Sequence, residues 1–593
     1  MKHLLTLNRF FIKYKWYLIL GIVFVTLSNY FAILIPQQIQ QALDLAQAKI
    51  LEYKSLSVSE QSGFYEELGS VLVHFALIIA VLAVVKGLMM FFMRQTIIVM
   101  SRYIEYDMRN EIFEHINKLD QAFMRGHQTG DIMARISEDV SKVREYLGPG
   151  LLYGINLVTL FAMTIYAMLR VDVTLTIFAL LPLPVLSVSI YYVSKLINKK
   201  SLLIKQQLSV LNSTAQETYS GIRVVKSYVK EEAFSDFFSE ESEEYKKRSL
   251  SLARVEAYFQ PLMALLISMS TLLVVLVGGF QFYNDNLTAG NIAEFILYVN
   301  MLTWPVTSIG WIASIIQTAE ASQSRINHLL LEKPGIINTN QDIYNLAGEI
   351  EFRNVTFVYP NTGIKALDNV SFKIRKGERI AIMGRTGSGK TTIAELLTRM
   401  FDATEGNIFI DGRDIREHNI NNLRDRIGYV PQDVFLFSDT ISGNISFGRP
   451  DSDMDKIKKY ADYASVRREI ESLPNRFDTV VGERGVTLSG GQKQRVSIAR
   501  ALIKEPDIVL LDDALSAVDT TTEQNILSFL DDELSGKTAV VITHRAGNQL
   551  KYDCILVLDN GRLAETGTHD QLLLNKGFYA QIYNQQQLQQ VEI

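Results

Sequence analysis

Six long apolar segments in the first half of the chain constrain its fold more than any other feature. A bilayer has a hydrocarbon core ~30 Å thick and a helix rises ~1.5 Å per residue, so about 20 apolar residues cross it. The segments that meet this requirement, some with a polar residue inside, are Trp16–Pro36, Val71–Met93, Leu151–Leu169, Val173–Val193, Leu262–Phe282 and Ile292–Ile316. The sequence therefore predicts six transmembrane helices with the lipid bilayer as a partner.

Basic residues are unevenly divided between the two sides of this predicted bundle. The segment Arg94–Leu147 carries eight Lys or Arg residues and Lys195–Val255 carries eleven. The loops on the opposite side together contain only Lys49, Lys54 and Arg170. Because cytoplasmic loops of membrane proteins are enriched in Lys and Arg, we expect both termini and both long loops to be cytoplasmic. The predicted location is the cell (inner) membrane.

The two long cytoplasmic loops are predicted to be helical extensions of the membrane spans. Ile104, Met108 and Ile112 recur at helical spacing, with charged residues on the other faces. Short reversals are expected within Asp120–Gly130 and Tyr219–Tyr228, where glycines interrupt the pattern. The alternative is that each loop forms a small separate domain, although neither shows strand-like alternation.

Two ionisable residues within the predicted spans, Lys86 and Glu294, are candidates for a cargo pathway. A charged group inside a bilayer is costly and by default marks a functional position. Two simpler interpretations stay open: Lys86 extends its ammonium to the interface, and Glu294 is close to water at a span end.

Length and composition narrow the remaining possibilities. A chain of 593 residues predicts at least two domains, and we place a transmembrane domain at 1–331, a linker at 332–346 and a nucleotide-binding domain at 347–593. The net charge of −5 gives no indication of nucleic acid as a partner. The single cysteine, Cys554, excludes a disulfide framework.

The second half of the chain has the pattern of an α/β domain with a phosphate-binding loop. Glu351–Phe357 alternates with period two, and Arg379–Met383 is a buried-strand run followed by a match to G-x-x-x-x-G-K-[ST]. In this loop backbone N–H groups surround the phosphates, a lysine contacts the β and γ oxygens, and a hydroxyl ligates Mg²⁺. The run Thr392–Met400 is predicted to be the following helix. The predicted nucleotide-binding residues are Gly384, Arg385, Thr386, Gly387, Ser388, Gly389, Lys390, Thr391 and Thr392.

Two further strands complete the predicted site. Ile508–Asp512 is an apolar strand that ends in a carboxylate, which we expect to hold Mg²⁺ together with Thr391. Thr538–Thr543 is followed by His544, whose imidazole is placed to reach a γ-phosphate or the attacking water. The predicted cofactors are therefore ATP and Mg²⁺.

The pentapeptide Leu488–Gln492 resembles the signature of ATP-binding-cassette (ABC) transporters. With six preceding spans, the whole chain is similar to a half-transporter of the multidrug exporter type. The resemblance implies a six-helix membrane domain joined to an α/β P-loop domain, and a dimer that holds two ATP molecules between P-loops and signatures. It assigns contacts with the partner's ATP to the signature residues Ser489, Gly490, Gly491 and Gln492.

The resemblance also assigns roles to three positions outside these motifs. Tyr359 is similar to the aromatic residue that stacks on adenine. Gln432 matches the glutamine that contacts Mg²⁺ and the water and relays to the membrane domain. Asp519, in Ser516–Asp519, matches the loop that crosses the dimer interface.

One position departs from the family pattern. The residue after Asp512 is normally a glutamate that acts as the catalytic base, and here it is Asp513. Its carboxylate is one methylene shorter and falls ~1.5 Å short of the intended water. The resemblance therefore implies the weak half of a heterodimeric exporter, with a homodimer of two slow sites as the alternative.

The sequence as a whole predicts ATP-driven export of an amphipathic or hydrophobic compound, drug-like first and lipid second. Closure of the two nucleotide domains on ATP would open the cavity outward, and hydrolysis would reset it. A different class stays open: a membrane protein that uses ATP binding as a gate or sensor with little transport.

Overall fold

A computed structural model describes residues 2–55, 61–482, 485, 487–515, 518, 520–533, 536–545 and 552–591. The chain divides into two compact units. The membrane unit comprises Met1–Ile116 and Gly130–Leu331, and the nucleotide unit comprises Asn117–Thr129 and Glu332–Ile593. Part of the first long loop therefore packs with the nucleotide unit.

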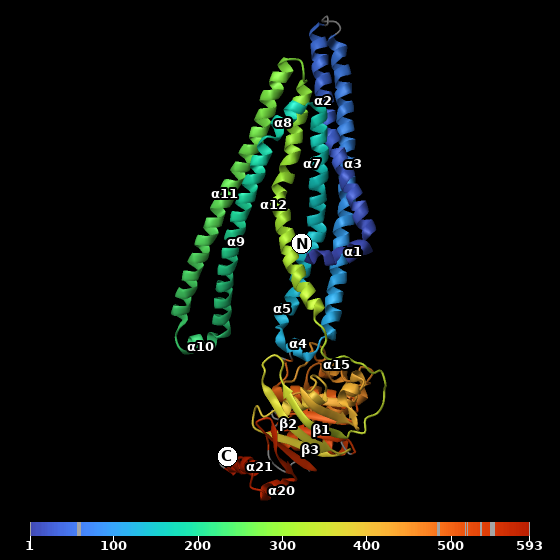
Figure 1. Cartoon of the computed structure of the whole chain (residues 1–593), viewed down its shortest axis with the longest axis vertical. Coiled ribbons are helices and arrows are strands. Elements are labelled where there is room, and N and C mark those ends of the chain that lie inside the picture. Colours follow the sequence, from blue (N-terminus) through green and yellow to red (C-terminus); the bar gives the residue numbers. More distant parts are fainter. Residues whose placement is uncertain are drawn as a thin grey trace. The chain divides into compact units, whose positions relative to one another are not determined.

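Long helices make up the membrane unit (Figure 1). Within the described residues, six helical stretches are long and apolar enough to cross a membrane, which confirms the predicted fold class. In chain order the helices are α1 (Asn8–Lys13), α2 (Lys15–Ser55), α3 (Gln61–Lys118), α5 (Thr129–Ala134), α6 (Val140–Glu145), α7 (Leu151–Val171), α8 (Val173–Leu180), α9 (Pro182–Ser220), α10 (Ile222–Ser227), α11 (Glu231–Tyr283) and α12 (Ala289–Leu331).

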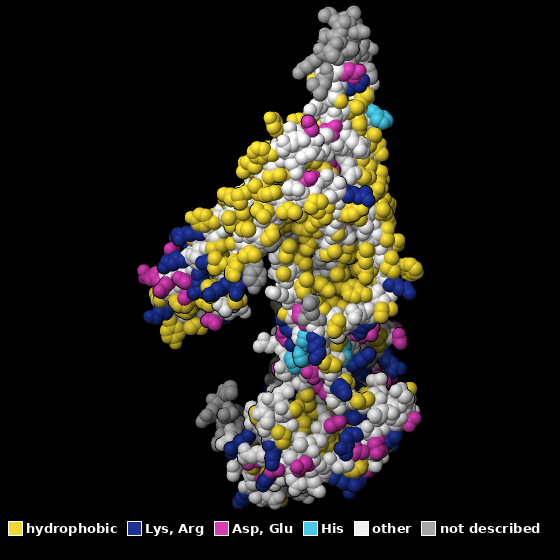
Figure 2. Space-filling model, turned by 45° about the horizontal axis from the view of Figure 1, so that its top comes forward, with side chains coloured by type: hydrophobic (Ala, Val, Ile, Leu, Met, Phe, Trp, Pro, Cys, Tyr) yellow, Lys and Arg dark blue, Asp and Glu magenta, His cyan; other side chains and the backbone are white. Residues whose placement is uncertain are grey.

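The helices extend well past the apolar segments, as predicted. Helix α3 has 58 residues and α11 has 53, far more than a bilayer requires. Helices α9 and α11 pack along each other, and the short helix α10 joins them at one end (Figure 1). The interpretation of the loops as separate small domains is therefore wrong. On the face drawn in Figure 2, hydrophobic side chains cover much of the membrane unit, and charged side chains gather at the free end of the α9–α11 hairpin.

The membrane unit is held together by apolar packing and a few buried polar contacts. Met168 of α7 and Phe295 and Tyr298 of α12 are fully buried in one cluster. Glu294, a candidate pathway residue, is also buried, and its carboxylate accepts a hydrogen bond of 2.8 Å from the Tyr298 hydroxyl. Nearer the end of α12, the Arg325 guanidinium pairs with the buried carboxylate of Asp139. This ion pair ties α12 to the segment that precedes α6.

Two sheets form the centre of the nucleotide unit. One is antiparallel, in the order β2-β1-β4-β5, and the other has the order β10-β9-β3-β8-β7-β6 with only β10 antiparallel. The strands are β1 (Ile350–Val358), β2 (Lys365–Ile374), β3 (Arg379–Gly384), β4 (Glu405–Ile410), β5 (Arg413–Asp414), β6 (Ile427–Val430), β7 (Ile508–Asp512), β8 (Thr538–Ile542), β9 (Cys554–Asp559) and β10 (Arg562–Gly567).

Helices surround these sheets. They are α4 (Gln121–Gly126), α13 (Lys390–Leu397), α14 (Ile420–Arg426), α15 (Ile441–Ser446), α16 (Met454–Tyr463), α17 (Arg467–Ser472), α18 (Gly490–Leu502), α19 (Thr520–Glu533), α20 (His569–Leu574) and α21 (Phe578–Val591). Strands β7 and β8 are completely buried, as expected for parallel strands covered on both faces.

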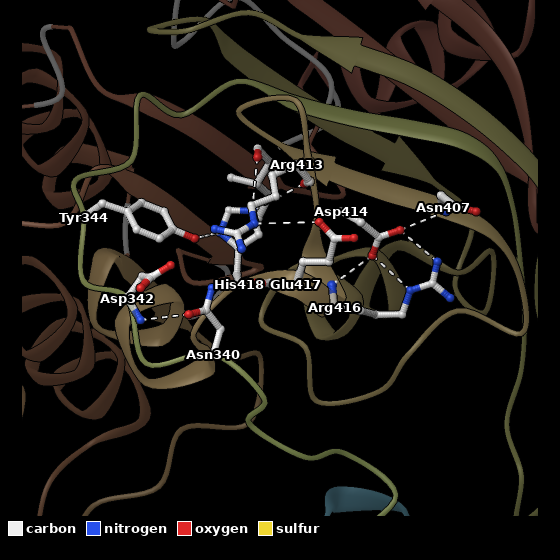
Figure 3. A network of polar contacts seen from close by, with 10 residues as sticks. Asn340, Asp342, Tyr344, Asn407, Arg413, Asp414, Arg416, Glu417 and His418 are labelled. Atoms are coloured by element: carbon white, nitrogen blue, oxygen red, sulfur yellow. Dashed lines mark hydrogen bonds and ion pairs between the residues drawn. The ribbon is translucent and has the colours of Figure 1, made fainter.

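The segment before β1 has no helix or strand, and polar side chains fasten it to the rest of the nucleotide unit (Figure 3). The Tyr344 hydroxyl lies 2.5 Å from Nδ1 of His418, which is 1% exposed. Nε2 of the same ring lies 3.2 Å from the Ile410 carbonyl oxygen and 3.3 Å from that of Arg413. Carbonyls only accept, so Nε2 carries a proton. Burial disfavours a second proton on Nδ1, which then accepts from the Tyr344 hydroxyl, and His418 is neutral in this arrangement.

Burial lowers the pKa of His418 below its ordinary value, although the hydrogen bonds to the Arg413 and Ile410 carbonyl oxygens act in the opposite direction. The unfolded chain therefore binds more protons than the folded one as pH falls through about 6.5, so stability is lost in that range. We expect protection of amides 338–348 from hydrogen exchange, corrected for intrinsic rates, to decrease between pH 7.5 and 5.5. The decrease should be smaller in His418→Gln. The Asn340→Ala variant serves as the control, because it loses a hydrogen bond from the same segment to the Glu417 carbonyl oxygen, about 1 kcal/mol, but leaves the histidine and its pH dependence in place. An unchanged slope in His418→Gln would contradict this account.

Candidate functional site

Four neighbouring parallel strands bring most of the predicted site residues to one edge of the larger sheet. Strands β3, β8, β7 and β6 are adjacent, and their carboxyl ends point the same way. Gly384 ends β3 and Asp512 ends β7, while Gln432 and His544 follow two residues after β6 and β8. Residues spread over more than 150 positions of the sequence thus meet where ligands of open α/β sheets bind.

The phosphate-binding loop requires glycine at defined positions. Gly384 has φ +150°, and a Cβ there would lie 2.2 Å from the Leu558 carbonyl oxygen. Gly389 has φ +95°, and its Cβ would lie 2.4 Å from the Ala366 carbonyl oxygen. Gly387 has φ +81°, and a Cβ added there would have no heavy atom within 4 Å, so this side of the loop is open. The result is a backbone cradle suited to a phosphate chain.

Lys390 lies at the start of α13, with its side chain folded over the loop. Its ammonium donates to the carbonyl oxygens of Gly384 at 3.0 Å and Arg385 at 2.8 Å. Burial lowers the pKa of Lys390, whereas the nearby carboxylates of Asp512 and Asp513 act in the opposite direction. Two carbonyl oxygens of the loop therefore hold the buried ammonium beside the backbone cradle, where a phosphate-binding lysine is required. The predicted helix Thr392–Met400 is displaced: α13 runs from Lys390 to Leu397.

Asp512 is suited to bind a divalent cation. It is 1% exposed, and burial together with the negative charge of Asp513 raises the pKa of Asp512 to about 6, against a hydrogen bond from Thr391. Among the described residues, Asp512 Oδ2 and Ser388 Oγ are buried without a hydrogen-bond partner. A cation with a phosphate chain would satisfy both atoms, so these residues fit Mg²⁺ and ATP.

The backbone of Asp513 is held in place on both sides. Its N–H donates to the Ile542 carbonyl oxygen at 2.9 Å, and its own carbonyl oxygen accepts from Gln494 Nε2 at 3.5 Å. Its φ is +49°, which is uncommon for a non-glycine residue. The side chain of Asp513 therefore extends from a backbone position that these two hydrogen bonds hold in place.

The other two predicted catalytic residues differ in their surroundings. Burial, aided by the charge of Lys390, lowers the pKa of His544, so its imidazole is neutral near pH 7. The Gln432 side chain is exposed. Of these two, His544 is therefore the one already packed into the site.

The signature residues lie at the start of a different helix. Ser489 caps α18: its hydroxyl accepts from Gln492 N–H, and its own N–H donates to Gln492 Oε1 at 2.9 Å. Ser489 and Gly490 are exposed, whereas Gly491 and Gln492 are half-buried. The bonds of Ser489 and Gln492 run to each other and to Glu469 of α17, which leaves the helix N-terminus facing outward. Asp519 lies outside the described residues.

Tyr359 lies over the first turns of α13. Its hydroxyl is 2.9 Å from Thr392 Oγ1 and donates to Glu395 Oε2 at 2.9 Å. Glu395 also pairs with Arg125 of α4, whose guanidinium carbon lies 5.2 Å from the centre of the Tyr359 ring. Tyr359, which is predicted to stack on adenine, therefore also contacts Arg125 in the reversal of the first long loop.

Sequence reasoning missed three residues that support the site. Arg125 and Glu395 join α4 to the P-loop helix. Glu469 accepts from the two terminal guanidinium nitrogens of the buried Arg495, at 2.6 and 2.9 Å, and so fixes the signature helix. The sequence carried one weak signal, an acidic residue inside the apolar run of α13, at Glu395.

Comparison with known proteins agrees with this architecture. The family model for the ABC transporter transmembrane region matches residues 18–306, and a second family model, described as ABC transporter, matches residues 367–516. A Bacillus subtilis (strain 168) protein described as the probable multidrug resistance ABC transporter ATP-binding/permease protein YheI is 36% identical over 82% of this chain and 84% of its own length. The chain belongs to the ABC transporter family.

Two further relatives place this ABC transporter among exporters. The ATP-dependent lipid A-core flippase of Shigella flexneri is 32% identical over 88% of this chain and 90% of its own length. A bacterial Atm1-family ABC exporter solved with ATP bound has a TM-score of 0.74 and 27% identity, covering 94% of this chain and 97% of that one. The chain is thus a multi-pass membrane protein with an ATP-binding domain that couples ATP hydrolysis to transport.

The glycine geometry predicts that two loop glycines of this ABC transporter respond differently to the same change. Gly384→Ala forces a Cβ against backbone that cannot move, and should abolish binding of a fluorescent ATP analogue by the full chain. Gly387→Ala meets open space and carries only the strain of its φ, about 1 kcal/mol, so binding should weaken by tenfold at most. Equal losses in the two variants would show that close packing at Gly384 does not control the loop.

Proposed function

We propose that this chain is one half of a dimeric exporter of amphipathic or hydrophobic compounds, paired with a different subunit, and that its own ATP site is weak. The observation that carries the proposal is Asp513, which stands where the family has a longer base. Both backbone hydrogen-bonding groups of Asp513 are engaged, so the backbone does not advance to compensate for the shorter side chain. Its carboxylate stays about 1.5 Å short of a water placed for a glutamate.

Other residues of this chain are suited to hold the nucleotide firmly. The loop N–H groups and Lys390 would bind the phosphates, Thr391 and Asp512 would hold Mg²⁺, and the neutral His544 would orient a γ-phosphate or water. These contacts require no general base. The site is therefore expected to bind ATP well and to hydrolyse it slowly.

The exposed start of α18 supports a role in a second subunit's site. Ser489 offers a hydroxyl, and the first turn of the helix offers free N–H groups to an anion. This chain's signature would then complete the partner's competent site, and hydrolysis there would reset the exporter. Both termini and the nucleotide unit would lie in the cytoplasm, on the side of the Lys- and Arg-rich loops.

The ATPase activity of the purified full chain in lipid nanodiscs tests this function. We expect slow turnover by the chain alone and an increase of about tenfold or more in Asp513→Glu, because a well-placed general base contributes about 10²-fold or more. Lys390→Met introduced into Asp513→Glu should remove the gain, which excludes a contaminating ATPase. Asp559→Glu, at the end of β9, is a matched control and should change nothing.

Two results would contradict the proposal. Rapid turnover by the unmodified chain alone would show that its own site is competent and would remove the reason for a second kind of subunit. Failure of Asp513→Glu to raise turnover would show that the length of this side chain does not limit hydrolysis.

A further inference from the structure

A cavity of about 440 Å³ lies between α9 and α12 of the membrane unit. The two helices run in parallel beside it, because Ile190 packs in one cluster with Val306 while Ser194 faces Gly310 one turn further along both helices. A Cβ on Gly310 would lie 2.8 Å from Ser194 Oγ, so the glycine permits this close approach. The volume falls in the range of small-molecule sites, about 300–1,000 Å³.

The lining of this cavity changes from apolar to polar along its length. Ile190, Val306 and Ile309 line the part that belongs to the earlier turns of both helices. Lys195, Asn198 and Gln317 line the part that follows. On α9 the change occurs within the nine residues from Ile190 to Asn198, about 12 Å of helix. The lining therefore matches a molecule with an apolar body and a polar head.

The charge at the polar end of the cavity determines which charge the head of the bound molecule can carry. Among the residues that the structure describes, Lys195 is the only charged one that lines the cavity, and no carboxylate accompanies it. The ammonium of Lys195 and the amides of Asn198 and Gln317 can all donate hydrogen bonds. Many lysines at span ends simply reach the lipid interface, but Lys195 lies against an apolar cavity with neighbouring donors. An anionic head would be stabilised here and a cationic head repelled.

We propose that this cavity binds an amphipathic anion, with its phosphate, sulfonate or carboxylate head at Lys195 and its apolar body along Ile190, Val306 and Ile309. The inference rests on the proposed export function, because it assigns a cargo class to it. Lys195 follows directly after the apolar stretch of α9, so the head lies at the level of the membrane interface and the body within the bilayer.

Direct binding to the full chain tests this inference without ATP. The probes are radiolabelled dodecyl phosphate and dodecyltrimethylammonium, which have the same tail and heads of opposite charge. A scintillation proximity assay measures their binding to the chain in phosphatidylcholine nanodiscs, with empty nanodiscs as background. We expect the wild type to prefer the anion. Lys195→Gln should weaken anion binding by about tenfold or more, because a charge-assisted hydrogen bond is lost, and leave cation binding unchanged.

Two variants sharpen the result. Lys199→Gln makes the same charge change on α9 at a residue that does not line the cavity, and should bind both probes like the wild type. Lys195→Glu should reverse the preference toward the cation. The inference is overturned if Lys195→Gln binds dodecyl phosphate as the wild type does, or if the wild type prefers the cation.

A second membrane composition distinguishes two sources of the anion. In nanodiscs that contain phosphatidylglycerol, this anionic lipid could compete with dodecyl phosphate for the cavity. Reduced dodecyl phosphate binding in the wild type but not in Lys195→Gln would identify a membrane lipid as the occupant. Equal binding in both membranes would identify a free amphiphile. Neither result depends on ATP hydrolysis, so a failed cargo assignment and a failed export function give different outcomes.

Discussion

The nucleotide unit depends on the hydrogen bonding of its buried parallel strands. Every N–H and C=O of β7 and β8 is removed from water and has to be paired within the sheet, which fixes the register of β3, β8, β7 and β6. The same register brings their carboxyl ends to one edge. The loops that follow can therefore bring a lysine, carboxylates and a histidine together from separate parts of the sequence.

Burial then sets the charge states at that edge. It raises the pKa of Asp512 and lowers those of Lys390 and His544, so each charged form needs a partner of opposite sign. The orphaned oxygens of Asp512 and Ser388 show that the chain alone does not satisfy this cluster. A site with these properties is organised around a bound phosphate chain and cation, and binding does not depend on the weak base at Asp513.

Much of this could be predicted from sequence because the signals are local. The phosphate loop, the strand Ile508–Asp512 and the six spans are contiguous patterns, and the structure places each where expected. The contacts that anchor the site were not predictable. Arg125 and Glu395 are 270 positions apart, and Glu469 reaches Arg495 from another helix. Pairings of this kind depend on tertiary packing. The early end of α13, where Arg399 adopts φ +49°, likewise follows from tertiary packing that overrides helix propensity.

We infer that this chain's P-loop retains ATP while a partner's site turns it over. This can be measured with photoreactive ATP that carries a label on its γ-phosphate. The assembled exporter completes several turnovers with this ATP and Mg²⁺, the bound nucleotide is crosslinked by light, and the two subunits are then separated. We expect the γ-label to stay on this chain and to be lost from its partner. Equal loss of the label from both subunits would contradict it.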